Sequence, residues 1–276
     1  MEIYNQIAKL VKENQSFVLA TIVKTEGSVP GKIGFKLLYQ STGKITGTVG
    51  GGALEKDVIT ECEKRWMNHI SGTKEYLLTD KPLTGKNTED ITVVPMMCQG
   101  RVWIYYEVYQ TSPTVYIFGG GHVGQALSYF LAKLNFRIIL IDNRPEFANS
   151  ERNPYAHQIV LKDYLKFCQE FQPPPQSFVV VVTHGHQFDY EIVKIIYSRQ
   201  LHVNYVGVIA SISKAKQLKK QLLSEMGSTF NLENLYTPIG LDLGGSTESD
   251  IALSIAAEIQ AVFHNKNLVH LRQMSE

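Results

Sequence analysis

Residues 115–124 read VYIFGGGHVG, and this stretch decides the fold of the second half of the chain. Four strand-forming residues lead into a turn in which Gly119, Gly121 and Gly124 have the G-x-G-x-x-G spacing. Residues 125–134 then have helical character. A strand, a glycine turn and a helix in this order are typical of a dinucleotide-binding unit.

The residues that follow this turn alternate between strand and helix patterns. Strands are expected at 137–141, 157–161, 178–183 and 203–208, and helices at 122–134, 163–170, 188–199 and 212–224. Such alternation with short connections predicts a parallel, doubly wound sheet. A last helix over about 247–264 is apolar on nearly all sides, which favours burial against the sheet or against a second copy in a homodimer.

The first half predicts a mixed α+β domain. An amphipathic helix is expected at 3–13, strands at 16–24, 35–39, 45–49, 74–79, 91–94 and 101–109, and a helix at 53–67. The polar, proline-containing segment QTSPT at 110–114 separates the two halves. We therefore expect an α/β protein with an N-terminal α+β domain at 1–110 and a Rossmann-like domain at 111–276.

The composition excludes several classes of partner. The 276 residues include 27 basic and 26 acidic side chains, a net charge of +1, so neither nucleic acid nor an anionic membrane is an expected partner. No apolar run reaches the roughly 18 residues of a membrane-spanning helix, and the N-terminus does not have the pattern of a signal peptide. The three cysteines contain no C-x-x-C pair, which favours a reduced, cytoplasmic location.

Asp142 supports a nucleotide site at the first glycine turn. It lies 142 − 119 = 23 positions after the first glycine, close to the spacing of roughly 20 for a carboxylate that binds ribose hydroxyls. NAD(P) or another nucleotide is therefore an expected ligand. Arg144 could instead meet a 2′-phosphate, and a Rossmann-like domain can also serve as an empty scaffold.

The segment THGHQFD, residues 183–189, places His184, His186 and Asp189 at the expected end of a central strand. These side chains could bind a divalent cation or a phosphate. The simpler alternative is a helix start with Asp189 in its first turn.

Two further features of the first half could bind a ligand. Gly50, Gly51 and Gly52 form a strand-to-helix turn whose backbone N–H groups favour an anion such as a phosphate, or the turn serves close packing. Cys98 lies in a loop and could act as a thiolate ligand or a sulfur carrier if it is exposed, or it is simply a small buried residue. Cys62 and Cys168 fall within expected helices, where we interpret them as packing residues.

Four segments together resemble the xanthine dehydrogenase accessory-protein family. They are ATIVKTEGSVPGKIGFKLLY at 20–39, GTVGGGALE at 47–55, the cysteine loop at 97–100, and YVGVIAS at 205–211 with TPIGLDLGGSTESDIALSIAAEI at 237–259. The resemblance implies a factor that binds molybdenum cofactor (molybdopterin) and supports its sulfuration and insertion into a xanthine dehydrogenase-type molybdenum hydroxylase. A cysteine desulfurase is a further implied partner.

The same resemblance implies a set of cofactor-binding positions. In the first half these are Gly27, Ser28, Pro30, Gly50, Gly51, Gly52, Glu55 and Cys98, with Cys98 as a contact of molybdenum. In the second half they are Gly119, Gly121, Gly124, Asp142, Asp242, Gly244 and Gly245.

Two other functions remain open at this point. An NAD(P)-dependent oxidoreductase would use the turn at 119–124, although no lysine or tyrosine stands beside His184 and His186 as a recognisable proton donor. A nucleotide-sensing regulatory module is the other, because VYIFGGGHVGQALS also resembles the ligand-binding domains of potassium-uptake regulators. A cofactor-binding maturation factor is favoured over a catalyst.

Overall fold

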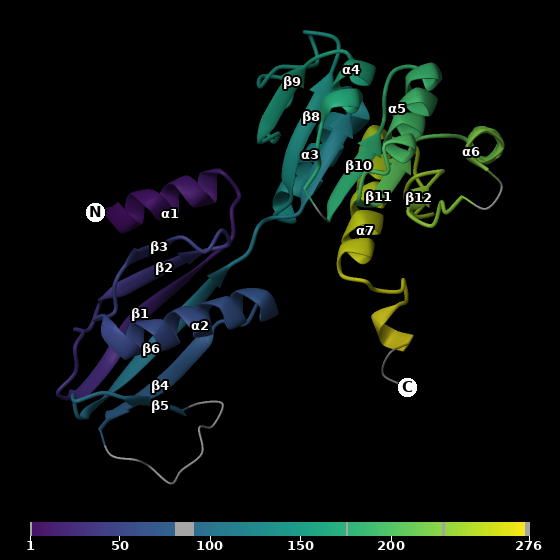
Figure 1. Cartoon of the computed structure of the whole chain (residues 1–276). Helices are drawn as coiled ribbons and strands as arrows, with labels where there is room; N and C mark the ends of the chain where they lie inside the picture. The colour runs from purple at the N-terminus through teal and green to yellow at the C-terminus, as the bar shows by residue number, and fades with distance from the viewer. Residues whose placement is uncertain (1, 81–90, 175, 228–229, 274–276) are drawn as a thin grey trace. The chain divides into compact units, whose positions relative to one another are not determined.

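A computed structural model describes residues 2–80, 91–174, 176–227 and 230–273 of the chain. Tertiary contacts divide the chain into an N-terminal unit, Met1–Thr111, and a C-terminal unit, Ser112–Glu276. The division lies next to the boundary expected after residue 110. The expected fold class, a mixed α+β unit followed by a Rossmann-like parallel sheet, is confirmed (Figure 1).

The N-terminal unit is a six-stranded sheet with a helix on each face. Its elements are α1 (Glu2–Lys12), β1 (Phe17–Gly27), β2 (Lys36–Gln40), β3 (Ile45–Gly47), α2 (Gly52–Asn68), β4 (Gly72–Thr79), β5 (Ile91–Pro95) and β6 (Gly100–Tyr109). The strand order is β3-β2-β1-β6-β4-β5, and neighbours are antiparallel except β4 and β5.

The alternation of side chains along β1 explains why both helices are needed. Val18, Ala20 and Ile22 are buried in the core that α2 covers, whereas Phe17 packs with Leu10 of α1 on the other face. Successive strand residues point to opposite faces, so a strand that is apolar on both must be covered twice. Figure 1 shows the two helices on opposite sides of this sheet.

The C-terminal unit is a six-stranded parallel sheet in the order β12-β11-β10-β7-β8-β9. Its elements are β7 (Thr114–Phe118), α3 (His122–Lys133), β8 (Arg137–Asp142), β9 (Gln158–Leu161), α4 (Tyr164–Glu170), β10 (Ser177–Val181), α5 (His186–Ser198), β11 (Val203–Val208), α6 (Ile212–Met226), β12 (Leu235–Tyr236), α7 (Glu248–Phe263) and the 3-10 turn η1 (Leu271–Gln273). The strands that follow β7 are added first on one side of it, as β8 and β9, and then on its other side, from β10 to β12. Ligands of such folds usually bind at the point where the strand order reverses in this way.

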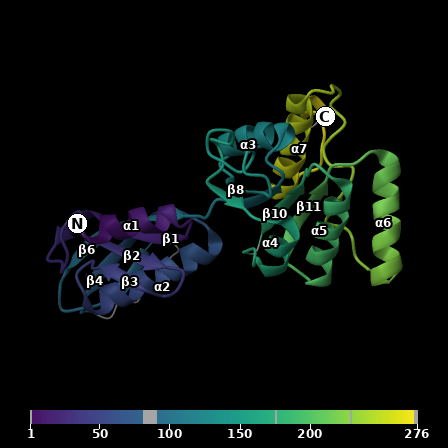
Figure 2. The ribbon, with the colours of Figure 1, turned by 90° about the horizontal axis from the view of Figure 1, so that it is seen from above.

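Helices cover both faces of the parallel sheet, and the two cores use alternate residues of the same strands. Val115 and Ile117 of β7 pack with α3 and α7, whereas Tyr116 and Phe118 pack in the core that contains α4 and α5. Figure 2 shows α3 and α7 on one side and α4 and α5 on the other. The apolar α7 is thus buried against its own sheet, through Ala252, Ile255, Ala256 and Ile259.

None of the helices in the described ranges is long and apolar enough to cross a membrane.

The contact between α3 and β7 requires glycine at position 124. A Cβ at Gly124 would lie 1.9 Å from the carbonyl oxygen of Gly119. We expect Gly124→Ala to lower the free energy of unfolding by about 3 kcal/mol or more, because the helix must move away from the strand.

Gly121→Ala is the matched control for this measurement, which is a urea titration of each variant. A Cβ at Gly121 would meet no atom within 4 Å, and its φ of −70° suits alanine. Because glycine is preferred over alanine at an N-cap, this change should lower stability by about 1 kcal/mol at most. Equal stability of the two variants would contradict the packing argument.

Candidate functional site

Three turns of the N-terminal unit meet at one end of its sheet, and we call them the three-turn cluster. They are residues 27–31 after β1, residues 49–52 before α2, and residues 96–100 between β5 and β6. The Ser28 N–H donates to the Gln99 carbonyl oxygen at 3.1 Å. The cluster therefore brings Cys98 and the glycine turn at 50–52, two features singled out from the sequence, next to residues 27–31.

Three glycines of the cluster are required because a side chain at their positions would collide with the backbone of a neighbouring turn. A Cβ at Gly31 would lie 2.4 Å from the Val49 carbonyl oxygen, and one at Gly50 would lie 2.8 Å from the Gly31 nitrogen. A Cβ at Gly100 would lie 2.6 Å from the Glu26 carbonyl oxygen. These residues let the three turns approach one another, which is a structural role.

The N–H groups of the glycine turn already have an anionic partner within the chain. One oxygen of Glu55, Oε2, accepts from the Val49 N–H at 3.1 Å, from the Gly51 N–H at 3.2 Å and from the Thr48 hydroxyl. The Gly50 N–H donates to Thr48 Oγ1 at 3.0 Å. The expected phosphate contact of Gly50 and Gly51 is therefore not supported by the geometry, and Glu55 faces the turn itself.

The exposure of the cysteines separates Cys98 from the other two. Burial raises the pKa of the Cys62 and Cys168 thiols to about 12, so both stay protonated at neutral pH. Cys98 is half-buried, in a loop whose Met97 is 93% exposed. Of the chain's three cysteines, Cys98 is thus the accessible thiol.

The C-terminal unit has a pocket of about 280 Å³ at the carboxyl edge of its sheet, where the strand order reverses at β7. Gly121 and His122 line it from the start of α3, and Arg144 and Phe147 from the loop after β8. Its remaining lining comes from Val123, from residues 182–184 after β10, and from Ile209 after β11. The pocket occupies the position at which open α/β sheets bind their ligands.

Asp142 does not face this pocket as a ribose acceptor would. Its carboxylate is fully buried and accepts from the Gly120 N–H at 2.7 Å, from the Arg144 N–H and Nε at 3.0 Å each, and from Arg144 Nη2 at 2.9 Å. Burial acts to raise the pKa of Asp142, but the hydrogen bonds from Arg144 and Gly120 outweigh it and hold the pKa below its usual value. Asp142 thus fastens the glycine turn and positions Arg144, and the geometry does not support the expected ribose contact.

Arg144, Phe147 and His122 line the pocket, and residues 152 and 153, which do not line it, contact them. The guanidinium carbon of Arg144 lies 3.9 Å from the centroid of the Phe147 ring. The guanidinium carbon of Arg152 lies 5.0 Å from the same centroid. Arg152 Nη2 lies 3.3 Å from His122 Nε2, and Asn153 Nδ2 donates to the carbonyl oxygens of Gly120 and Phe147. Sequence reasoning missed Phe147, Arg152 and Asn153, which lie in a loop without a recognisable motif.

The metal site expected from His184, His186 and Asp189 is not supported. His184 is exposed and its ring lies 5.4 Å from that of Phe188, whereas Asp189 is 3% exposed and accepts from Thr183 Oγ1 at 2.6 Å. The side chain of His186 lies outside what the structure describes. Within the described ranges no three His, Cys, Asp or Glu side chains gather as a metal site.

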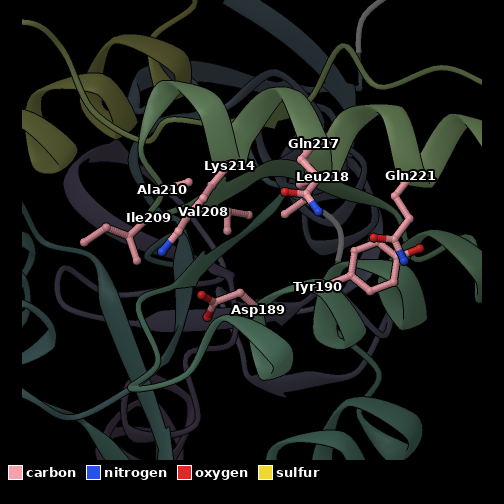
Figure 3. A pocket seen from close by; sticks show the side chains of 9 residues that line it. All are labelled: Asp189, Tyr190, Val208, Ile209, Ala210, Lys214, Gln217, Leu218 and Gln221. Atoms are coloured by element: carbon pink, nitrogen blue, oxygen red, sulfur yellow. The ribbon is translucent and has the colours of Figure 1, made fainter.

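Asp189 instead lines a second pocket, of about 200 Å³, between α5 and α6. Figure 3 shows Asp189 and Tyr190 on the α5 side of this pocket and Lys214 on the α6 side. His184 and Asp189 thus belong to different pockets, although Ile209 borders both.

The segment with Asp242, Gly244 and Gly245 follows β12 and leads into α7. Asp242 is exposed. Gly244 has a φ of +79°, and a Cβ at Gly245 would lie 2.4 Å from the Asp250 carboxyl carbon, in the capping box of α7. The two glycines thus shape the entry to the helix, and the cofactor contact expected of Asp242 and Gly244 stays a prediction.

We expect Glu55→Ala to lower the free energy of unfolding by about 1–3 kcal/mol, because the N–H groups of Val49 and Gly51 lose their acceptor. Glu55→Gln keeps an oxygen acceptor and should lose less. Chemical denaturation compares the variants. Wild-type stability of Glu55→Ala would show that the carboxylate does not hold the turn.

Asp142→Asn should lower the free energy of unfolding by about 3–5 kcal/mol, because it leaves the Arg144 charge without its buried partner. The control is Asp163→Asn, at the N-cap of α4, where asparagine caps as well as aspartate and the loss should stay below about 0.5 kcal/mol.

The effect of Asp142→Asn should also depend on pH. Because the pKa of Asp142 is lowered by folding, its stabilisation is present above the unfolded-state value of about 3.9 and is lost as the pH falls through the folded-state pKa. The stability difference from wild type should therefore shrink below about pH 4. A constant difference from pH 7 to pH 2 would contradict the ion pair.

Comparison with known proteins identifies both units. Residues 115–259 match the family model described as the XdhC Rossmann domain, and residues 10–76 match the XdhC and CoxI family. A relative in Escherichia coli, the uncharacterized protein YqeB, is 27% identical over 96% of this chain, which spans only 47% of that protein. A probable xanthine dehydrogenase subunit from Bacillus subtilis is 23% identical, over 93% of this chain and 96% of its own length.

A solved structure has the same fold over nearly the whole chain. The crystal structure of a xanthine dehydrogenase from Bacillus halodurans matches with a TM-score of 0.52 and 20% identity, over 95% of this chain and 96% of the other. The model of the XdhC Rossmann domain matches more than half of the residues of this chain, and the chain therefore belongs to the XdhC family.

Proposed function

We propose that this chain is an accessory factor that binds molybdenum cofactor and supports its sulfuration and insertion into a xanthine dehydrogenase-type molybdenum hydroxylase. Membership of the XdhC family and the name of the Bacillus subtilis relative support the accessory role. The observation that carries the proposal is the accessible thiol of Cys98 within the three-turn cluster.

The residues of the cluster fit one part of this cofactor. When bound, the cofactor supplies a molybdenum centre held by dithiolene sulfurs, and a thiolate is a soft ligand of the kind such a metal prefers. Cys98 offers that ligand. The phosphate of the cofactor does not fit the turn at 50–52, because Glu55 and Thr48 accept from Val49, Gly50 and Gly51.

The packing of the cluster keeps the thiol in a defined place. Cys98 is half-buried against the core under α2, and the next residue but one, Gly100, is held against the carbonyl oxygens of Glu26 and Ser28. A short loop fixed at this end presents its sulfur with little freedom to move, which lowers the entropy cost of binding.

The oxidoreductase alternative has less support. Asp142 is engaged by Gly120 and Arg144 and has no accepting oxygen free of a bond for ribose hydroxyls. A cysteine desulfurase and the apo-hydroxylase are the partners that the proposed function entails. A homodimer and a cytoplasmic location stay predictions.

The test is retention of molybdenum cofactor by the full chain. Each variant is incubated with cofactor released from a molybdoenzyme and then desalted, and both molybdenum and pterin are measured per chain. We expect Cys98→Ser to retain at least tenfold less than wild type. Cys62→Ala, which removes a buried thiol of the same unit, is the control and should retain wild-type amounts.

Two results would count against the proposal. Wild-type retention by Cys98→Ser would remove Cys98 from the site. Failure of the wild-type chain to retain any cofactor would refute cofactor binding as a whole.

A further inference from the structure

The pocket between α5 and α6, of about 200 Å³, is not used by the proposed function. Asp189 and Tyr190 line it from α5, and four residues of α6 line it from the other side. Its volume is below the roughly 300–1,000 Å³ of pockets that hold drug-sized ligands. A ligand of this pocket is therefore a small molecule, below the size of a nucleotide.

α6 turns three polar side chains toward this pocket. The helix buries Ala215 and Leu222. An adjoining stripe, with spacings of three and four residues, lines the pocket and consists of Lys214, Gln217 and Gln221. Figure 3 shows these three side chains extending from α6 toward α5. Their ammonium and amide groups are therefore placed to form hydrogen bonds to a ligand between the two helices.

One end of the pocket carries opposite charges on its two sides. Figure 3 shows Asp189 of α5 and Lys214 of α6 at this end. Asp189 is 3% exposed, and its Oδ1 accepts from Thr183 Oγ1 at 2.6 Å. A carboxylate has about four acceptor sites and an ammonium group three donors, so each can bind more than one partner. This end therefore suits a ligand that carries an ammonium group and a carboxylate close together.

The other end of the pocket has neutral hydrogen-bonding groups, those of Tyr190 and Gln221. The Tyr190 hydroxyl is buried and makes no hydrogen bond to another described residue. A buried hydroxyl without a partner is unfavourable, and a polar group of a ligand would supply the missing bond. Beyond this end, Lys194 Nζ and Glu225 Oε2 form an ion pair at 2.7 Å that joins α5 to α6.

The remaining lining of the pocket limits the class of ligand. It is apolar and consists of Val208, Ile209, Ala210 and Leu218, which suits the methylene groups of a short side chain. The described lining includes one cation, Lys214, and one anion, Asp189. A phosphate ester or a dicarboxylate would place an excess of negative charge beside the buried Asp189 carboxylate, which disfavours both.

We propose that the pocket between α5 and α6 binds a free α-amino acid with an uncharged, polar side chain, such as glutamine. The ammonium group of the ligand lies against Asp189 and its carboxylate against Lys214. The end of its side chain reaches Tyr190 and Gln221. This inference rests on residues of the C-terminal unit alone and is independent of the proposed function.

The experiment is a calorimetric titration of the full chain with L-glutamine and with two of its analogues. Glutaramate lacks the ammonium group, and 4-aminobutanamide lacks the carboxylate. L-Glutamine should bind at least tenfold more tightly than either analogue, because each lacks the group that Asp189 or Lys214 binds.

Variants of the pocket test the assigned contacts. Lys214→Met should weaken binding of L-glutamine at least tenfold and leave binding of 4-aminobutanamide unchanged, because that analogue has no carboxylate. Lys216→Met is the matched control, since Lys216 is exposed on the same helix and does not line the pocket. Tyr190→Phe should keep the wild-type unfolding temperature and weaken binding of L-glutamine about fivefold, through loss of one hydrogen bond.

Several results would overturn this proposal. They are no binding of L-glutamine at millimolar concentration, an analogue or L-leucine that binds as tightly as L-glutamine, and wild-type affinity of Lys214→Met for L-glutamine. Tyr190→Phe decides the last question if Lys214→Met lowers the unfolding temperature. Retention of molybdenum cofactor is measured on the Cys98 variant, so the proposed function and this inference fail independently.

Discussion

The fully buried carboxylate of Asp142 is the constraint on which the site of the C-terminal unit depends. An ionised carboxylate removed from water costs several kcal/mol unless hydrogen bonds and an opposite charge replace the lost hydration. The Gly120 N–H and three donors of Arg144 do so here. The same bonds fix the glycine turn at the end of β7 and hold Arg144 on the wall of the pocket. One buried charge therefore determines both the backbone conformation of the turn and the position of the Arg144 guanidinium.

A carboxylate also accepts hydrogen bonds from a glycine turn in the N-terminal unit, but there the consequence differs. Glu55 lies four residues after Gly51 on α2 and accepts from the N–H groups of Val49 and Gly51, so the protein's own carboxylate serves as the anion of that turn. Asp142 reaches only the Gly120 N–H of its turn and leaves the space beside Gly121 open. Two turns that look alike in sequence therefore differ in whether an external anion has room to bind.

Local sequence patterns predict the strands and helices, but they do not predict how the side chains of the site are arranged. The apolar runs at 115–118 and 178–183 predicted strands, which are confirmed as β7 and β10, whereas the two residues of β12, Leu235–Tyr236, are too few to show a period. The 23-residue spacing singled out Asp142 but gave no information on the direction in which its carboxylate points. That direction depends on Arg144, and the turn it supports also depends on Asn153, whose bond to Gly120 joins residues 33 positions apart.

Chemistry that depends on exposure also lies beyond a sequence pattern. The sequence pattern placed Cys98 in a loop and the other two cysteines in helices, and burial adds the chemical difference: the thiols of Cys62 and Cys168 have pKa values raised to about 12, whereas Cys98 is only half-buried. The three-turn cluster thus offers a half-buried thiol, whereas the N–H groups of Gly50 and Gly51 are already bonded to Thr48 and Glu55. The phosphate of a ligand held by Cys98 would therefore need donors other than the N–H groups of Val49, Gly50 and Gly51.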